Sequence, residues 1–239
     1  MMTSPESEAK IAQMFDKVAP RYDFLNALLS MRQDKRWRKK LVSLCSDHKG
    51  ASYLDVATGT GDVITAIGEK RPDAKELYGV DISEAMLNLA KVKTKHYSFS
   101  SILKFGVMSA EKLQFSDAKF DTVSISFGLR NVINKKNALS EFARVLKPGG
   151  KLLILEFFTP EGTIFSRLFQ WYFHQVLPKI GALFSDREAY HYLPKSVGSF
   201  YSYKELNKLL HELGFEHKQT VTYLFGSCRL ILLRKKECY

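Results

Sequence analysis

A glycine-containing segment, residues 55–62, has the residue types and spacing of a ligand-binding turn. It follows a short apolar run suited to a buried strand and leads into a segment with the pattern of a helix. Gly59 and Gly61 allow backbone dihedrals that other residues adopt at a cost, and they let the main chain approach a ligand closely. Asp55 and Asp62 place negative charge on both sides of the turn. That charge is the wrong sign for a pyrophosphate, so we expect a positively charged cofactor.

The surroundings of the turn narrow the cofactor further. Ile64 stands where a dinucleotide-binding turn would have its third glycine, and no Lys-Ser or Lys-Thr pair follows as in a phosphate-binding loop. A second apolar run, residues 77–80, ends at Asp81, whose carboxylate can accept hydrogen bonds from two ribose hydroxyls. S-adenosylmethionine combines an ammonium, a sulfonium and a ribose. The sequence therefore predicts this cofactor, held by Asp55, Gly59, Gly61 and Asp81.

The adenine of that cofactor should lie next to its ribose. Met86 lies in the first turn of the helix expected over residues 84–92, and it is either a core residue or part of the adenine site. The next strand, residues 102–107, is followed by Ser109 and Ala110. Loops at the carboxyl ends of parallel strands line the ligand crevice of such sheets. We therefore expect Ser109 and the backbone of Ala110 beside the adenine.

Two further polar side chains follow a central strand expected over residues 120–126. The loop after it contains Arg130 and Asn131, and by the same rule it faces the reacting end of the ligand. Both side chains offer planar, directional hydrogen bonds. They are candidates for binding an oxygen-bearing substrate.

The elements that must position these residues alternate regularly along the chain. Helices are expected over residues 63–70, 84–92, 135–146 and 204–213, and later strands over 151–157, 219–224 and 228–233. Gly226 and Ser227 suit a hairpin turn between the last two strands, and Pro148, Gly149 and Gly150 are expected to close the third helix. This pattern predicts a single α/β domain with a doubly wound, mostly parallel sheet.

Two segments interrupt the alternation. Residues 1–50 contain a helical pattern over 7–18 that should end at Pro20, and they form either a helical pair packed on the core or a lid over the glycine turn. Residues 158–203 form an aromatic-rich insertion. It is either an accessory helical subdomain or the wall of an apolar substrate pocket.

Composition bounds the class of protein. The chain has 239 residues and a formal net charge of +11, with basic residues concentrated in 32–40 and 234–236. These segments are a solvated surface, or they attract anionic lipid or nucleic acid. Three cysteines far apart in sequence, no secretory pattern at residues 1–8 and no apolar stretch of about 20 residues indicate a cytoplasmic protein that meets a membrane only from its surface.

Five segments together carry a resemblance to a known family: residues 15–26, 55–62, 127–132, 144–150 and 155–157. They resemble the quinone-biosynthesis C-methyltransferases, which methylate demethylmenaquinol and, in some bacteria, the corresponding ubiquinone precursor. The resemblance runs over nearly the whole chain. It implies a seven-stranded sheet that ends in a hairpin, S-adenosylmethionine as methyl donor, and cofactor contacts at Thr60, Asp81, Ser109, Ala110 and Ser126. Ser109 departs from the asparagine or aspartate usual there.

The implied reaction assigns further roles. A sulfonium already makes its methyl group electrophilic, so the enzyme must chiefly hold a nucleophilic ring carbon in line with it. We expect a membrane-dissolved prenylated quinol, most simply demethylmenaquinol, with Arg130 stabilising phenolate charge and Asn131 orienting the ring oxygen. Tyr22 is a candidate base for the ring proton, as are His174, His191 and Tyr203.

Several alternatives stay open from the sequence. A benzoquinol acceptor, or an O- or N-methyltransferase of another small molecule, would use the same cofactor residues. An RNA methyltransferase would explain the positive charge, but the sequence lacks a nucleic-acid module or base-flipping motif, so no nucleic-acid partner is expected. No Cys/His cluster has metal-ligand spacing, so no metal is expected. Peripheral contact with an anionic membrane at the inner face of the cell membrane and a homodimer are both left open.

Overall fold

The computed structural model describes residues 4–21, 30, 32–160 and 195–237. These residues form a seven-stranded sheet in the order β3-β2-β1-β4-β5-β7-β6, in which β7 runs antiparallel to both β5 and β6 and the other neighbouring strands are parallel. The strands are β1 (Ser52–Val56), β2 (Glu76–Asp81), β3 (Leu103–Val107), β4 (Phe120–Ser126), β5 (Leu146–Phe157), β6 (Phe215–Tyr223) and β7 (Cys228–Lys235). The doubly wound sheet with a terminal antiparallel pair confirms the predicted fold class.

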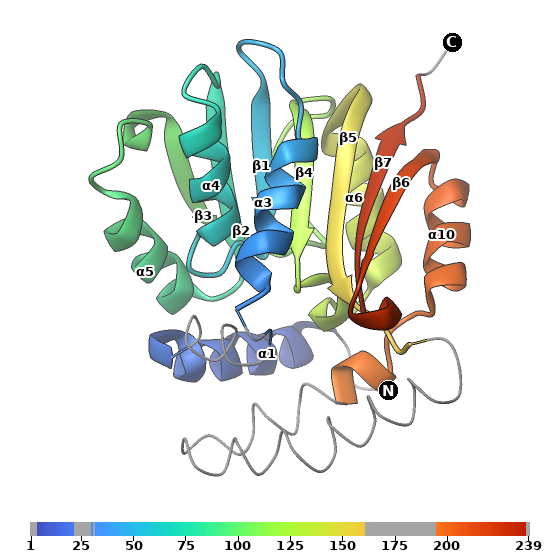
Figure 1. Ribbon diagram of the computed structural model, residues 1–239. Helices are drawn as coiled ribbons and strands as arrows, with labels where there is room; N and C mark the ends of the chain where they lie inside the picture. The colour runs from blue at the N-terminus through green and yellow to red at the C-terminus, as the bar shows by residue number, and fades with distance from the viewer. Residues whose placement is uncertain (1–3, 22–29, 31, 161–194, 238–239) are drawn as a thin grey trace.

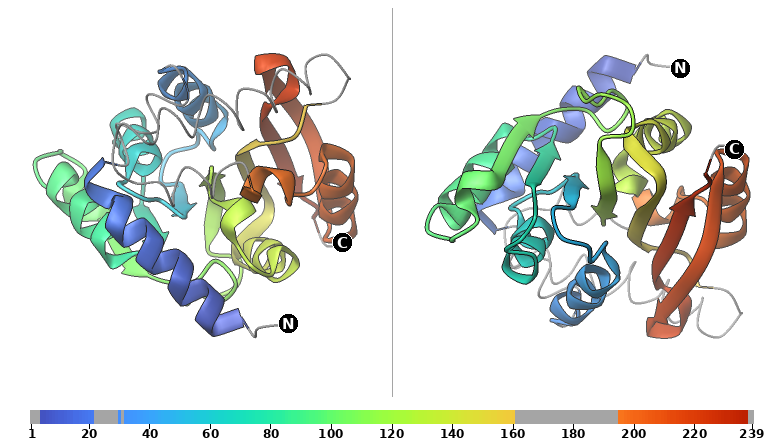
Figure 2. Two further views of the ribbon diagram at one scale, coloured as in Figure 1. Left: turned by 90° about the horizontal axis from the view of Figure 1, so that it is seen from below. Right: turned by 90° about the horizontal axis from the view of Figure 1, so that it is seen from above.

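Helices cover both faces of this sheet (Figures 1 and 2). Their bounds are α1 (Ser4–Val18), α3 (Asp34–Leu44), α4 (Asp62–Lys70), α5 (Glu84–Thr94), α6 (Lys135–Val145) and α10 (Tyr203–Glu212), with short 3-10 segments η1 (Ala19–Arg21), η2 (Ser100–Ile102), η3 (Leu129–Asn131) and η5 (Leu224–Gly226). Because successive side chains of a strand point to opposite faces, β1 divides its apolar residues between two cores. Leu54 packs with α6 and α10, whereas Tyr53 packs with α3 and α4.

The turn expected at residues 148–150 is a bulge inside β5. The strand begins at Leu146, which pairs with Phe120, and the register then shifts so that Thr122 pairs with Lys151. Gly149 has a φ of +72°, which glycine adopts without strain. A bulge tolerates Pro148, and glycine accommodates the positive φ at position 149. The strand therefore continues where the sequence pattern predicted a break.

Helix α1 lies along the carboxyl ends of the parallel strands (Figure 1). It ends at Val18, as expected from Pro20, and it packs against α5. Of the two interrupting segments, residues 22–29 and 161–194 lie outside the described residues, so a pocket wall built by the insertion stays a prediction. None of the described helices is both long and apolar enough to cross a membrane.

Candidate functional site

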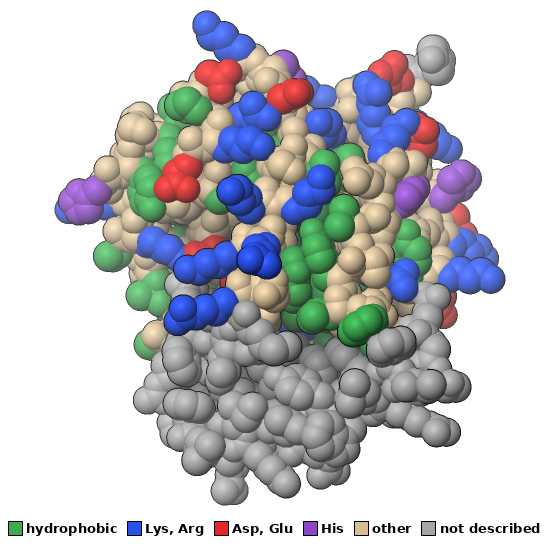
Figure 3. All heavy atoms as spheres, viewed as in Figure 1, with side chains coloured by type: hydrophobic (Ala, Val, Ile, Leu, Met, Phe, Trp, Pro, Cys, Tyr) green, Lys and Arg blue, Asp and Glu red, His purple; other side chains and the backbone are tan. Residues whose placement is uncertain are grey.

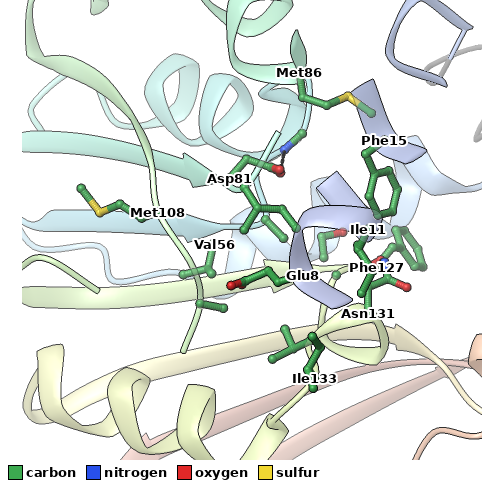
Figure 4. A pocket seen from close by; sticks show the side chains of 17 residues that line it. Glu8, Ile11, Phe15, Val56, Asp81, Met86, Met108, Phe127, Asn131 and Ile133 are labelled. Atoms are coloured by element: carbon green, nitrogen blue, oxygen red, sulfur yellow. Dashed lines mark hydrogen bonds between the residues drawn. The ribbon is translucent and has the colours of Figure 1, made fainter. Parts of the chain in front are cut away.

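A pocket opens at the carboxyl ends of β1, β2, β3 and β4, under α1 (Figure 4). It contains about 640 Å³ of empty space, a volume that includes solvent at its mouth. Each of these four strands contributes residues from its carboxyl end or from the loop that follows. The described lining residues are Glu8, Ile11, Phe15, Val56, Ala57, Gly59, Asp81, Ile82, Met86, Met108, Ala110, Ser126, Phe127, Gly128, Asn131, Val132 and Ile133.

The glycine turn forms one wall of this pocket. Gly61, with a φ of +81°, is the N-cap of α4, and a Cβ at this position would lie 3.1 Å from the Cβ of Ala90. Gly59 also has a positive φ, and its backbone N–H donates to Oδ2 of Asp81 over 2.9 Å. The turn therefore needs glycine both for backbone conformation and for close packing on α5.

Asp81 lies where its carboxylate can accept hydrogen bonds from a ligand. It ends β2, is 8% exposed, and lines the pocket. Its two oxygens accept from the backbone N–H groups of Gly59 and Ser83, each over 2.9 Å. Burial raises the pKa of Asp81, and these backbone donors oppose that rise. Because an ionised carboxylate has about four acceptor positions, it retains capacity for hydroxyl donors.

Contrary to the expectation, the two carboxylates that flank the turn do not face the pocket. Asp55 is 1% exposed and accepts from the hydroxyls of Thr58 and Ser124, each over 2.6 Å. Burial raises its pKa to about 6, against the lowering effect of these two hydrogen bonds. Neither Asp55 nor Asp62 is among the described lining residues. Asp55 therefore supports the turn from below and is not placed to contact a ligand directly.

Asp62 instead connects the turn to two neighbouring helices. Its carboxylate binds Arg38 of α3 and Lys93 of α5. Although burial alone would raise the pKa of Asp62, the charge of Arg38 and the hydrogen bond from Lys93 lower it. The sign of the charge suggested a cofactor contact, but the nearest cations belong to the protein itself.

The predicted adenine residues divide into those that line the pocket and one that does not. Met86 and Ala110 are buried and line it. Ser109 is not among the described lining residues; its hydroxyl donates to Glu8 of α1 and accepts from the backbone N–H of Glu111 over 3.1 Å. Thr60 is buried and also lies outside the lining set.

Two buried polar atoms of the pocket lining lack a hydrogen-bond partner among the described residues. They are Oγ of Ser126 and Oδ1 of Asn131, and both residues line the pocket. A buried polar atom without a partner costs free energy, and most such atoms are satisfied in native proteins. A bound polar ligand would satisfy them. The pocket therefore brings together Asn131, which was expected at the reacting end, and Ser126, which was expected at the cofactor.

Arg130 is placed differently from the expectation. Its Nη1 donates to Oε1 of Glu156 over 2.7 Å and to the carbonyl of Phe127 over 2.5 Å, and its backbone N–H donates to Oε2 of Glu156 over 3.1 Å. Glu156 is fully buried, and Arg130 is not among the described lining residues. Contact of Arg130 with phenolate charge is therefore not supported, because its guanidinium already neutralises Glu156. Its evident role is to hold the loop that carries Asn131.

Strained backbone marks the place where two loops meet. Ala57 and Phe127 have φ values of +51° and +58°, and a Cβ on Gly128 would lie 2.5 Å from the Cβ of Ala57. Residues other than glycine are uncommon in this conformation, which persists only where surrounding contacts enforce it. The glycine loop and residues 127–132 therefore pack too closely for any side chain at position 128.

The residues of the site that were not found from the sequence include three on α1 and one on β5. Glu8, Ile11 and Phe15 enter the pocket from α1, and Glu156 anchors Arg130 (Figure 4). The spacing of 8, 11 and 15 places these side chains on one helical face, which was a usable signal once α1 is known to cross the pocket. Glu156 gave no signal because its partner lies 26 residues away.

Of the four candidate bases, Tyr203 lies among the described residues. The hydroxyl of Tyr203 lies 2.7 Å from Oγ1 of Thr220 on β6, and Tyr203 is not among the lining residues. Tyr22, His174 and His191 lie outside the described residues. Within the part of the chain that is described, no group of three His, Cys, Asp or Glu side chains could hold a metal ion.

Comparison with known proteins adds sequence relatives. The model of the ubiE/COQ5 methyltransferase family matches residues 2–231. A ubiquinone/menaquinone biosynthesis C-methyltransferase of Geobacter sulfurreducens is 43% identical over 92% of this chain and 86% of its own. A demethylmenaquinone methyltransferase of Bacteroides fragilis is 38% identical over 95% of this chain and 92% of its own.

Solved structures share the fold at low sequence identity. The [4+2]-cyclase SpnF gives a TM-score of 0.73 at 17% identity, covering 95% of this chain and 96% of its own. A SAM-dependent methyltransferase from Aquifex aeolicus gives 0.57 at 19% identity, covering 83% and 89%. At such identities the likeness shows the fold alone, since one fold serves many reactions.

Proposed function

Because this chain belongs to the ubiE/COQ5 methyltransferase family, we propose that it transfers a methyl group from S-adenosylmethionine to a ring carbon of a prenylated quinol. We propose demethylmenaquinol as the acceptor, because a relative that matches 95% of this chain is named a demethylmenaquinone methyltransferase. The observation that supports this proposal most strongly is the pocket itself. It combines a buried carboxylate at Asp81 with two unsatisfied polar atoms at Ser126 and Asn131, on otherwise mostly apolar walls.

The residues present fit S-adenosylmethionine. Asp81 would hold the ribose hydroxyls, the backbone at Gly59 would lie against the methionine part, and Met86 and Ala110 would contact the adenine. The cofactor supplies an electrophilic methyl group when bound. The orphaned polar atoms of Ser126 and Asn131 belong to the same pocket lining, where they would pair with polar groups of the bound ligands.

The chain's own contribution to the reaction is mainly positioning. Asn131 would orient a ring oxygen through its free amide oxygen, which can accept a hydrogen bond from a quinol hydroxyl. Arg130 and Glu156 would hold that loop rigid. A quinol hydroxyl donates electron density to the ring carbon, whereas the carbonyl of an oxidised quinone withdraws it. We therefore propose the reduced form as substrate.

Methyl transfer to a panel of acceptors tests this function. The protein would be incubated with methyl-labelled S-adenosylmethionine and a reduced prenylated naphthoquinol, a reduced benzoquinol, the oxidised naphthoquinone or total RNA. We expect label in the naphthoquinol, at a rate at least tenfold above that for the oxidised quinone. Equal rates for quinol and quinone would contradict the substrate form, and label in RNA alone would contradict the substrate class.

We also propose that the basic face of α3 attracts anionic lipid. Lysines and arginines gather over α3 and α4 on the face shown in Figure 3. Lys35, Arg36 and Lys39 are exposed there. Phe225, which is 74% exposed, lies in η5 between β6 and β7, beside the carboxyl end of β5. A long-tailed quinol is dissolved in membrane, so a basic and aromatic edge near the pocket would bring the enzyme to its substrate.

Reversing two lysines tests this surface. Lys35→Glu with Lys39→Glu is expected to weaken co-sedimentation with anionic vesicles by about thirtyfold or more at low salt, because each of the two lost basic residues contributes about 1 kcal/mol near an anionic surface. Lys204→Glu with Lys208→Glu on α10 is the matched control, since these lysines are exposed with the same spacing and the charge change is equal. An equal loss in both pairs would contradict a site on α3, as would binding that does not fall at high salt.

A further inference from the structure

Glu8 is a pocket carboxylate that the reaction described above does not use. It lies on α1 and enters the pocket from that helix (Figure 4). One of its oxygens accepts from the hydroxyl of Ser109. The position of Glu8 is thus set by a residue 101 positions away, in the loop expected beside the adenine.

Ser109 uses its only hydroxyl hydrogen in this arrangement. Its hydroxyl hydrogen points to Glu8, and its oxygen accepts from the backbone N–H of Glu111 over 3.1 Å. The side chain itself is not among the described lining residues. Ser109 therefore orients Glu8 and is not placed to accept a hydrogen bond from a ligand.

The other lining residues at this end of the pocket offer an adenine no side-chain acceptor. Ile82, Met86, Met108 and Ala110 are apolar. Among the described lining residues, the only other carboxylate is that of Asp81, whose oxygens already accept from Gly59 and Ser83 and face the ribose position. An exocyclic amine has two N–H donors, and burying one without a partner is costly.

We propose that Glu8 accepts a hydrogen bond from the 6-amino group of the adenine, an inference that rests on the proposed cofactor. The second carboxylate oxygen of Glu8, which has no hydrogen-bond partner among the described residues, supplies the acceptor. Through this hydrogen bond a residue of α1 recognises the adenine, so α1 both contributes to the cofactor site and covers it.

Asp16 on the same helix provides a contrast. Its carboxylate accepts from the hydroxyl of Ser83 over 2.5 Å and from the backbone N–H of Ala85 over 3.4 Å, at the start of α5. It is not among the described lining residues. Asp16 holds α1 in place without reaching the pocket. A variant at Asp16 therefore distinguishes loss of helix docking from loss of base recognition.

Calorimetric titration with two ligands tests the role of Glu8. One ligand is S-adenosylhomocysteine, and the other is its analogue in which hydrogen replaces the 6-amino group. Glu8→Ala is expected to weaken S-adenosylhomocysteine about tenfold to a hundredfold, the range for a hydrogen bond to a charged group. It should leave the affinity for the analogue within about twofold. Asp16→Ala should change both affinities by the same factor.

A second variant guards against simple disruption of α1. Glu8→Gln keeps an acceptor oxygen on the side chain that enters the pocket, and we expect it to retain part of the preference for the 6-amino group. An equal loss for both ligands in Glu8→Ala, or no loss for either, overturns the role of Glu8. If the unaltered protein binds neither ligand, the proposed cofactor fails instead, and with it the inference.

Discussion

Replacing Asp81 with alanine is expected to weaken the binding of S-adenosylhomocysteine by a hundredfold or more. Two ribose hydroxyls would each donate to this carboxylate, and hydrogen bonds to charged groups are worth about 1.5–3 kcal/mol each. Together they correspond to a factor of at least about 10² in the dissociation constant. The variant also leaves the backbone N–H groups of Gly59 and Ser83 without their acceptor, which loosens the glycine turn.

Isothermal titration calorimetry measures this loss directly. Asp73→Ala is the control, since Asp73 is exposed and lies outside the described lining residues. The affinity of Asp81→Asn for S-adenosylhomocysteine should lie between those of Asp81→Ala and Asp73→Ala. Its amide oxygen still accepts from one hydroxyl, but its NH₂ group faces the backbone N–H donors and cannot accept from them. A loss below threefold in Asp81→Ala would show that the ribose lies elsewhere.

Replacing Glu156 with alanine is expected to lower the free energy of unfolding by about 3–5 kcal/mol. The substitution leaves the nearly buried guanidinium of Arg130 without its partner, and removing one member of a buried ion pair is strongly destabilising. It also releases the loop that carries Asn131, so methyl transfer should fall even under conditions where the variant is folded. Urea unfolding followed by circular dichroism measures the first effect.

A paired replacement separates charge from loop position. Arg130→Met with Glu156→Leu removes both charges and keeps similar volume, and such replacements of buried pairs are often neutral or stabilising. We expect the pair to recover most of the stability lost in Glu156→Ala, without recovering methyl transfer. Recovery of both properties would show that Arg130 has no part in shaping the site. A loss below 1 kcal/mol in Glu156→Ala would contradict a buried ion pair.

Local patterns predicted most of the fold. Strand β4 was predicted at its observed bounds because its residues are buried almost throughout, so the apolar run and the strand coincide. The start of β5 was wrong, because proline and glycines that usually end a strand lie here in a bulge between β4 and β5. Whether a bulge or a turn forms depends on the partner strand, which a local pattern does not contain.

The site was less predictable than the fold, because its geometry depends on contacts between distant segments. The position of Asp81 follows from the rule that ligands bind at the carboxyl ends of parallel strands. The charge of Asp55 suggested a ligand contact, but its carboxylate is turned under the loop toward Thr58 and Ser124. Likewise Arg130 is paired with Glu156, a contact that no local spacing specifies.

The position of the transferred methyl group tests the proposed reaction most directly. The protein would be incubated with S-adenosylmethionine carrying a ¹³C-labelled methyl group and reduced demethylmenaquinol, and the product would be examined by NMR spectroscopy. We expect the label as a methyl group bonded to a ring carbon. A methoxy signal, or no labelled quinol with a functional preparation that binds S-adenosylhomocysteine, would contradict C-methylation of a quinol by this protein.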